Sequence, residues 1–397
     1  MQDKQHIILL FLSMFILIAF VGIFQSWNLA LTIFNLCIIS SIMSLGINIQ
    51  WGNAGIVNFG VMGFAALGGL ANIIVAMPPT AKAWDAGAIF ILFGIIIFIL
   101  SIIFSILVWL KSGLSKKKKY ILNFLLIILG YFLMRYIIDS PIKAIEAIEP
   151  AKTGYLGGLD LPVIISWPIG GLLAALIAFV IGKISLGLRS DYLAIATLGI
   201  SEIIIYILKN EDWLSRGVKN VNGLPRPVPY EIDLQSEPWV LELTKFFNIP
   251  VSEISSIIVK LSYSCIFLLI LIGILFLLET AHKSPWGRMM RAIRDNEEAA
   301  NAMGKNVVKQ HLLIFILGSA IVGIAGAMLV TQDGLFTPGS YRPMRYTFLI
   351  WVMVIVGGSG NNFGAILGGF VVWFLWVEAA PIALFFINLF TAHLPET

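Results

Sequence analysis

The sequence predicts an all-α membrane protein, a polytopic helical bundle with about 8–11 transmembrane helices. One observation is composition: hydrophobic residues make up 59% of the chain, charged residues 12%, and the mean hydropathy is +0.93. Soluble domains carry roughly twice that share of charge. The other is that the apolar residues form runs of about 20, the length that crosses a bilayer as a helix. We therefore expect one transmembrane domain over residues 1–397.

The apolar runs begin near the N-terminus and recur along the whole chain. They cover 7–25, 29–50, 56–77, 88–110, 120–138, 161–182, 191–208, 257–278, 312–330 and a broken pair from about 346 to 385. The first run is longer than the apolar core of a signal peptide, and no small-x-small cleavage site follows it. We expect it to be an uncleaved helix.

The distribution of lysine and arginine predicts the orientation of the chain. Three loops are basic, at 111–119, 183–189 and 283–309, and two predicted spans separate each successive pair. All three can therefore lie on one side, which the positive-inside rule makes the cytoplasmic side together with the N-terminus. The segments between them lean acidic. They include a long external loop at 209–256, in which 237–247 is expected to form a short helix on the membrane surface.

Two glycine-dense zones, 46–69 and 357–369, lie within the predicted membrane region. Asn48, Asn53 and Asn58 are interleaved with the glycines of the first zone, and Asn361 and Asn362 with those of the second. Asparagine and glycine at membrane depth predict a broken or re-entrant helix, which is tolerated only where the backbone is buried in protein or lines a cavity. For the glycines alone we favour close helix packing. A packing role and a role in shaping a translocation path fit the remaining residues equally well, namely Asn53, Asn58, Asn361 and Asn362.

Glu202 is a carboxylate inside the predicted span 191–208, with Thr197 and Ser201 on nearby turns. An ionisable side chain inside a span is costly and is a functional hypothesis by default. One interpretation is that Glu202 lines the translocation path and faces an ammonium group or water. The other is a structural role, either paired with a buried donor or close to the outer interface near Lys209.

A polar island interrupts the apolar runs from Ser284 to Gly304, within the loop 279–311. Its spacing resembles the EAA loop of ABC-importer permeases, the cytoplasmic helix that seats in a cleft of the ATP-hydrolysing partner. By this resemblance, the residues that couple the chain to the ATPase are Arg288, Arg291, Arg294, Glu298, Ala299, Ala300 and Gly304.

The sequence offers no reactive constellation, so we do not expect an enzyme, a bound cofactor or a metal site. There is no Gly-x-x-x-x-Gly-Lys-Ser/Thr phosphate loop, which places ATP hydrolysis on a separate chain. The four histidines are scattered without metal-ligand spacing. The two cysteines, Cys37 and Cys265, fall in apolar runs as small hydrophobic residues.

Five stretches together resemble the branched-chain amino acid ABC-importer permeases, in the subunit of the M type. They run in family order: 45–60, 190–202, 222–227, 284–304 and 356–360. The resemblance implies a bacterial cytoplasmic-membrane protein that pairs with a second homologous permease, two ATPase subunits and a periplasmic substrate-binding protein. It also implies branched-chain amino acids as cargo, with urea, short amides or other amino acids as the alternative. The Leu-Pro pair that follows Ile314 in the fuller EAA motif is absent.

Other function classes fit the residues less well. Broken helices and an intramembrane glutamate are also typical of ion-coupled secondary transporters, but the two halves of the chain show no repeat. Members of the family usually continue beyond the equivalent of Leu394–Thr397 with an apolar segment and a basic tail. We therefore expect either an unusual C-terminus or an incomplete chain.

Overall fold

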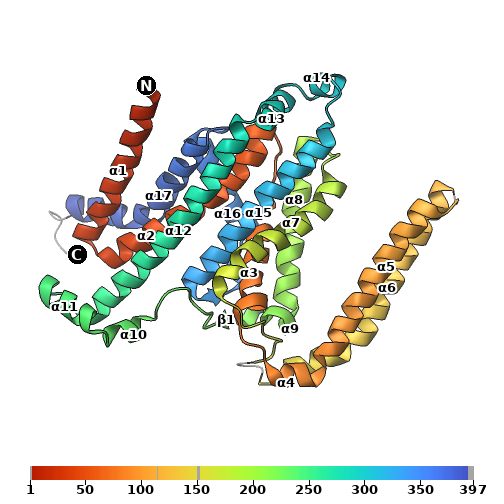
Figure 1. The fold of residues 1–397 in the computed structure, drawn as a ribbon, viewed down its shortest axis with the longest axis horizontal. Coiled ribbons are helices and arrows are strands. Elements are labelled where there is room, and N and C mark those ends of the chain that lie inside the picture. The colour runs from red at the N-terminus through yellow and green to blue at the C-terminus, as the bar shows by residue number, and fades with distance from the viewer. Residues whose placement is uncertain (1, 114, 150–152, 392–397) are drawn as a thin grey trace.

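The computed structural model describes residues 2–113, 115–149 and 153–391. Over these residues the molecule is almost wholly helical, and its two strands, β1 (Val221–Asn222) and β2 (Leu335–Phe336), have two residues each (Figure 1). Nine helices in this part of the chain are long and apolar enough to span a membrane, and α3 (Val61–Ala76) and α16 (Pro343–Gly357) are shorter apolar helices. The predicted fold class is confirmed. The expectation for Leu394–Thr397 lies outside the described residues.

Each long helix lies on a run that the sequence predicts. They are α1 (Gln2–Phe24), α2 (Trp27–Ile47), α5 (Ile89–Lys111), α6 (Lys116–Glu146), α7 (Val163–Ser185), α8 (Ser190–Asn210), α12 (Val251–Lys283), α15 (Val307–Asp333) and α17 (Asn362–Thr391). A short α4 (Ala81–Ala83) and a π turn, η2 (Trp84–Ala88), lead into α5.

The centre of the bundle is α15, which packs against α7, α3 and α2. Small residues let these backbones approach closely, as helices do in membranes. A side chain on Gly68 of α3 would collide with the backbone of Gly323 in α15, and one on Gly326 would collide with Ala65. Buried polar side chains add hydrogen bonds between the helices: the Asn72 amide donates to the Ala327 carbonyl at 2.6 Å.

Both glycine-dense zones contain the helix breaks that the sequence predicts. After α2 the chain passes through a π turn, η1 (Asn48–Gly52), and residues 55–60 are non-helical before α3 begins. The second break follows α16, where Gly358 and Gly360 have φ values of 90° and 84° that favour glycine. Helix α17 then starts at Asn362.

Helices α5 and α6 form a hairpin that stands apart from the bundle in Figure 1. An apolar cluster joins its base to the rest of the chain. The buried members are Ala83, Ala88, Ile91, Ile138, Ile142, Ile145, Leu156 and Trp213. The guanidinium of Arg135 in α6 also pairs with Glu211 at 3.4 Å.

The segment between α8 and α12 forms short elements at one end of the bundle. They are α9 (Asp212–Ser215), a 3-10 turn η3 (Gly217–Lys219), α10 (Glu231–Gln235) and α11 (Pro238–Phe247). Helix α11 confirms the short helix expected at 237–247. Strand β1 pairs antiparallel with β2, which precedes a 3-10 turn, η4 (Pro338–Ser340).

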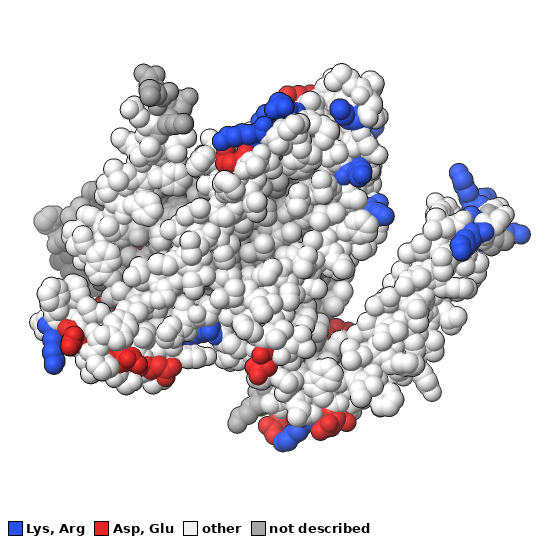
Figure 2. Space-filling view, in the orientation of Figure 1, with Lys and Arg blue, Asp and Glu red and all other residues white. Residues whose placement is uncertain are grey.

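The charges divide between the two ends of the bundle (Figure 2). Lysine and arginine gather over α13 (Pro285–Asp295), α14 (Glu297–Ala302) and the tip of the α5–α6 hairpin. Most aspartate and glutamate residues lie at the opposite end, over α9 to α11 and the hairpin base. We call these ends the basic side and the acidic side. The start of α1 lies on the basic side.

Candidate functional site

The polar island folds as two short helices because its polar residues cap them. The Ser284 hydroxyl accepts from the Gly287 amide at the start of α13, and Pro285 occupies the first turn. The Asn296 side chain accepts from the Ala299 amide at 2.9 Å and begins α14. Asn306 caps α15 in the same way. The loop 279–311 is therefore folded into two short helices, which lie between the end of α12 and the start of α15.

Helix α13 is amphipathic and rests on the bundle through one face. Met290 and Ile293 are buried on that face. The Trp286 indole donates to the Gln310 amide oxygen at 2.9 Å and ties α13 to the first turn of α15. Arg291 hydrogen-bonds the His282 ring at the end of α12. These contacts join α13 to both α12 and α15, so a displacement of α13 is transmitted to both helices.

Arg294, in the last turn of α13, contacts both helix breaks. Its Nη1 donates to the Gly52 carbonyl at 2.6 Å. The same nitrogen would lie 3.3 Å from a Cβ on Gly360, and the Arg294 Cγ would lie 3.5 Å from a Cβ on Gly55. A charge-assisted hydrogen bond to a carbonyl at the end of a helix is a strong contact. Arg294 therefore links the coupling loop directly to the points where the membrane helices are interrupted.

A second set of hydrogen bonds joins the two breaks to the end of α12. The Glu279 carboxylate accepts from the Asn362 amide at 2.9 Å, and the Asn362 amide oxygen accepts from Asn48 at 2.9 Å. Asn48 in turn accepts from the Gly360 backbone amide at 2.8 Å. Asn48 and Asn362 are buried. Because buried polar groups are costly to leave unpaired, this network holds the two breaks in one relative position.

Side chains form hydrogen bonds with the backbone amides of the non-helical segment 55–60 and of the start of α3. They come from the segment itself and from α8. Asn58 donates to Gln50 at 2.9 Å, and its oxygen accepts from the Gly60 amide at 2.8 Å. The Thr197 hydroxyl accepts from the Phe59 amide at 2.9 Å, and the Ser201 hydroxyl accepts from the Gly63 amide at 2.7 Å. Irregular backbone at membrane depth needs such partners. These contacts account for the polar face of α8.

The coupling residues predicted from the sequence differ in exposure: Ala300 is buried, Arg291 is half-buried and the others are exposed. Glu298, Ala299 and Gly304 are exposed on and just after α14, whereas Ala300 is only 4% exposed and packs inward. Arg288 is exposed and donates to the Lys283 carbonyl. Arg291 and Arg294 face the bundle through the contacts described above. The surface open to a partner is therefore the outer face of α14 with the polar side of α13.

The remaining residues predicted for a path lie in three different places. Asn53 faces a crevice beneath α13 that Trp286 also lines, and its amide oxygen is buried without a donor among the described residues. Asn361 is exposed and accepts from the Phe363 amide at the start of α17. Glu202 is half-buried at the edge of the packed face of α8 and forms no ion pair within the described part of the chain.

Sequence reasoning missed three polar residues that the structure places at contacts between helices. Gln50 donates to the Phe315 carbonyl of α15, and Glu279 closes the network to Asn362. Glu378 is 2% exposed in α17 and accepts from Gln25 at 2.8 Å. A carboxylate inside an apolar run was the available signal for Glu378, the same signal that singled out Glu202.

The fold and the site define a class: a polytopic helical membrane permease with two interrupted helices and a structured polar loop between two long helices. The chain belongs to the branched-chain amino acid transport system permease component family, whose model matches residues 29–385.

The relatives that the chain matches are themselves transport permease proteins. The chain is 30% identical over 203 residues to the high-affinity branched-chain amino acid transport system permease protein LivM of Escherichia coli, covering 50% of this chain and 47% of that one. It is 27% identical over 205 residues to a probable LivM of Methanocaldococcus jannaschii, covering 50% and 51%. A xylose transport system permease protein, XylH of Escherichia coli, is 25% identical over 231 residues, covering 57% and 46%. The chain thus spans about half the length of these relatives. No solved structure matches.

Proposed function

We propose that the chain is the M-type permease subunit of an ABC importer for branched-chain amino acids, and that loop 279–311 receives the movement of an ATP-hydrolysing partner. The observation that carries the proposal is the 2.6 Å hydrogen bond from Arg294 Nη1 to the Gly52 carbonyl. It connects a loop that is exposed on the basic side with a break inside the membrane region. The names of the LivM relatives support the cargo.

In this mechanism the partner ATPase holds the exposed face of α14, where Glu298, Ala299 and Gly304 lie. A push on α14 and α13 shifts Arg294 and the end of α12 together. Both contacts lead to the same place, because Arg294 reaches Gly52 and Glu279 reaches Asn362. The breaks move as a unit and open or close the path. The chain carries out no covalent step.

The proposed assembly has this chain beside a second, homologous permease, two ATPase subunits and a periplasmic binding protein, in the bacterial cytoplasmic membrane. The N-terminus and the basic side face the cytoplasm, since basic loops resist translocation. The residues first assigned to a path, Asn53, Asn58, Thr197, Ser201, Glu202, Asn361 and Asn362, act chiefly by shaping the breaks in this proposal. Glu202 is the exception, because its half-exposed carboxylate is free to face a partner or the path.

Replacing Arg294 tests the coupling role. In the complete assembly reconstituted in vesicles, Arg294→Ala should lower L-leucine uptake by roughly 10- to 100-fold, the loss of one hydrogen bond to a charged group. ATP hydrolysis should continue, because the docking face on α14 is unchanged. Arg294→Lys should recover part of the uptake.

The matched control is Arg189→Ala, which removes an exposed arginine on the loop between α7 and α8. It should transport at the wild-type rate. Wild-type uptake by Arg294→Ala would overturn the coupling role, and equal losses in both variants would attribute the effect to charge on the basic side alone.

A further inference from the structure

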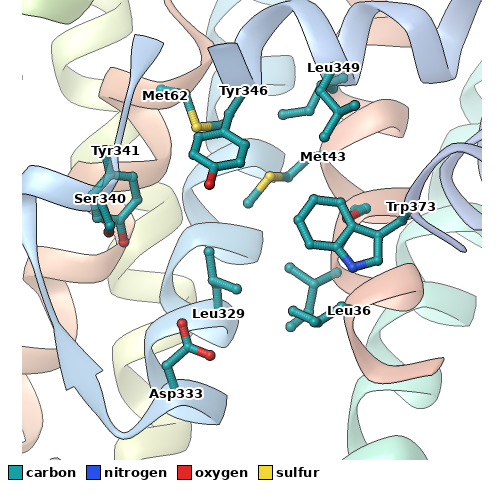
Figure 3. A pocket seen from close by; sticks show the side chains of 13 residues that line it. Leu36, Met43, Met62, Leu329, Asp333, Ser340, Tyr341, Tyr346, Leu349 and Trp373 are labelled. Atoms are coloured by element: carbon teal, nitrogen blue, oxygen red, sulfur yellow. The ribbon is translucent and has the colours of Figure 1, made fainter. Parts of the chain in front are cut away.

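A cavity of about 280 Å³ lies inside this chain's own bundle, between α2, α3, α15, α16 and α17 (Figure 3). Its volume is near the lower end for small-molecule sites, about 300 Å³. Most of its wall is aliphatic or thioether, from Leu36, Ile39, Met43, Met62, Leu329, Leu349 and Ile350. A wall of this kind suits a short branched hydrocarbon chain.

The polar groups of the cavity gather where α15 ends on the acidic side. Asp333 lies at this end, and its carboxylate points into the cavity in Figure 3. Asp333 takes part in none of the ion pairs formed among the described residues. Tyr341 also lines the cavity, and its burial, together with the Asp333 charge, raises the pKa of Tyr341 above its ordinary value. Tyr341 thus stays neutral and able to donate.

A second buried polar group faces the same cavity from α17. The Trp373 indole N–H is buried and has no acceptor among the described residues. Trp373 and Tyr346 stand on the walls formed by α17 and α16 in Figure 3. A buried donor without a partner is costly, which indicates a site where an acceptor is supplied from outside the chain.

A cation, Arg226, lies beside Gly334, the residue that follows Asp333. Strand β1 pairs with β2 directly after Gly334, and this pairing brings Arg226 next to the end of α15. The Arg226 Nη2 would lie 3.9 Å from a Cβ on Gly334. Its Nη1 is held by Glu231 at 2.8 Å. An acidic group that lines the cavity and a basic group next to the following residue therefore lie at the same end of α15.

We propose that this cavity is a binding site for a small aliphatic α-amino acid within the permease chain itself. The ammonium group pairs with Asp333, the carboxylate is directed toward Arg226, and the side chain lies against Leu36, Met43 and Leu349. The identification of this ligand as the imported cargo rests on the proposed function, whereas the binding itself does not.

The test is equilibrium binding to the full chain purified in detergent, with no ATPase and no binding protein present. L-leucine should bind, 3-methylbutylamine, which lacks the carboxylate, should bind more weakly, and 4-methylpentanoate, which lacks the amine, should not bind. Asp333→Asn should weaken binding of leucine and of the amine by at least about tenfold. Arg226→Gln should weaken binding of leucine and leave the amine unchanged.

Two further variants separate the site from general effects on folding. Asp233→Asn removes an exposed carboxylate of α10 on the same side and should bind leucine as the wild type does. Ser40→Leu fills the cavity from α2 without changing its charge and should abolish binding.

The site is overturned if the wild-type chain binds none of the three probes, if Asp333→Asn binds leucine normally, or if 4-methylpentanoate binds as well as leucine. An equal loss of the amine and of leucine in Arg226→Gln would remove Arg226 from the site. Because no ATPase is present, these outcomes leave the Arg294 experiment to judge the coupling role separately.

Discussion

The bundle around α15 and the α5–α6 hairpin are both built from helices apolar enough to span a membrane, yet the two regions differ in how much of each helix is buried. Of the residues in the apolar stretch of the α2 span, 78% are buried, and the corresponding share for α15 is 61%. The corresponding shares are 17% for the span that contains α5 and 11% for α6. The difference lies in the small and polar residues: α2, α3 and α15 carry glycine, serine and asparagine at their contacts, whereas α5 is mostly isoleucine, leucine and phenylalanine.

The comparison shows which residues build a core in a membrane. Hydrocarbon chains of lipid are as apolar as leucine, so large apolar residues gain little by facing another helix. Close backbone approach and hydrogen bonds between helices decide the packing instead. In the bundle, Gly46 of α2 meets the Gly318 backbone of α15, and Gln50 donates to Phe315. In the hairpin, Gly94 and Gly130 make the close contacts, and these serve only the pairing of α5 with α6 among the described residues.

The largest expected effect comes from filling a backbone contact in the bundle. Gly68→Val places a branched side chain against the Gly323 backbone. Backbone atoms, unlike a side chain, cannot avoid the collision by a change of rotamer. We expect destabilisation of about 3 kcal/mol or more, at or above the upper end for overpacking, and loss of most folded protein. The measurement is the yield of monodisperse protein after extraction. Gly273→Val in α12 is the control, because nothing lies within 4 Å of a Cβ there; an equal loss in the control would contradict the argument.

Labelling of single cysteines tests whether the hairpin tip and loop 279–311 share one side of the membrane. The expected difference between positions is labelling against no labelling. Single cysteines at Ser115, Asn301 and Ser236, in a background with Cys37 and Cys265 changed to serine, are treated with an impermeant thiol reagent on intact cells. Only the Ser236 position should react, because the two basic segments are cytoplasmic in the proposed topology. Labelling of Asn301 would place loop 279–311 on the wrong side for an ATPase.

The smallest expected effect is a glycine substitution in the hairpin. Gly130→Val meets the Ser101 Oγ and Cβ rather than main-chain atoms. The hydroxyl can rotate away, and the Cβ contact is relieved by a small separation of α5 from α6, which stand apart from the bundle. We expect a cost of about 1 kcal/mol, at the lower end for overpacking, with uptake within about twofold of wild type. Thermal unfolding and L-leucine uptake measure the two quantities. A loss of uptake as severe as that of Gly68→Val would make the hairpin part of the transport machinery.

Most of the fold was predictable because run length and composition are local properties. Each predicted span contains a helix, and both glycine-dense zones contain a break. The partners at those breaks were not predictable, since they come from distant parts of the chain. Arg294 is 242 residues from Gly52, and Gln50 is 265 residues from Phe315. The basic island indicated a coupling loop, but only the packing of α13 shows which of its arginines points inward.

Helix α15 has a consequence for how the two ends of the protein communicate. It runs without a kink from the coupling loop at Val307 to Asp333 at the cavity mouth, and at 1.5 Å per residue its 27 residues measure about 40 Å. Its contacts with α3 and α7 at Gly323 and Gly326 are made mostly by backbone and alanine atoms, which leave few large side chains to oppose a small tilt. A tilt of about 5° about its basic end would swing the other end by roughly 3.5 Å over that length. Since β2 follows directly and pairs with β1, the same swing would carry part of the outer loop with it. In the proposed mechanism, α15 would thus act as a lever that carries a movement of loop 279–311 to the acidic side.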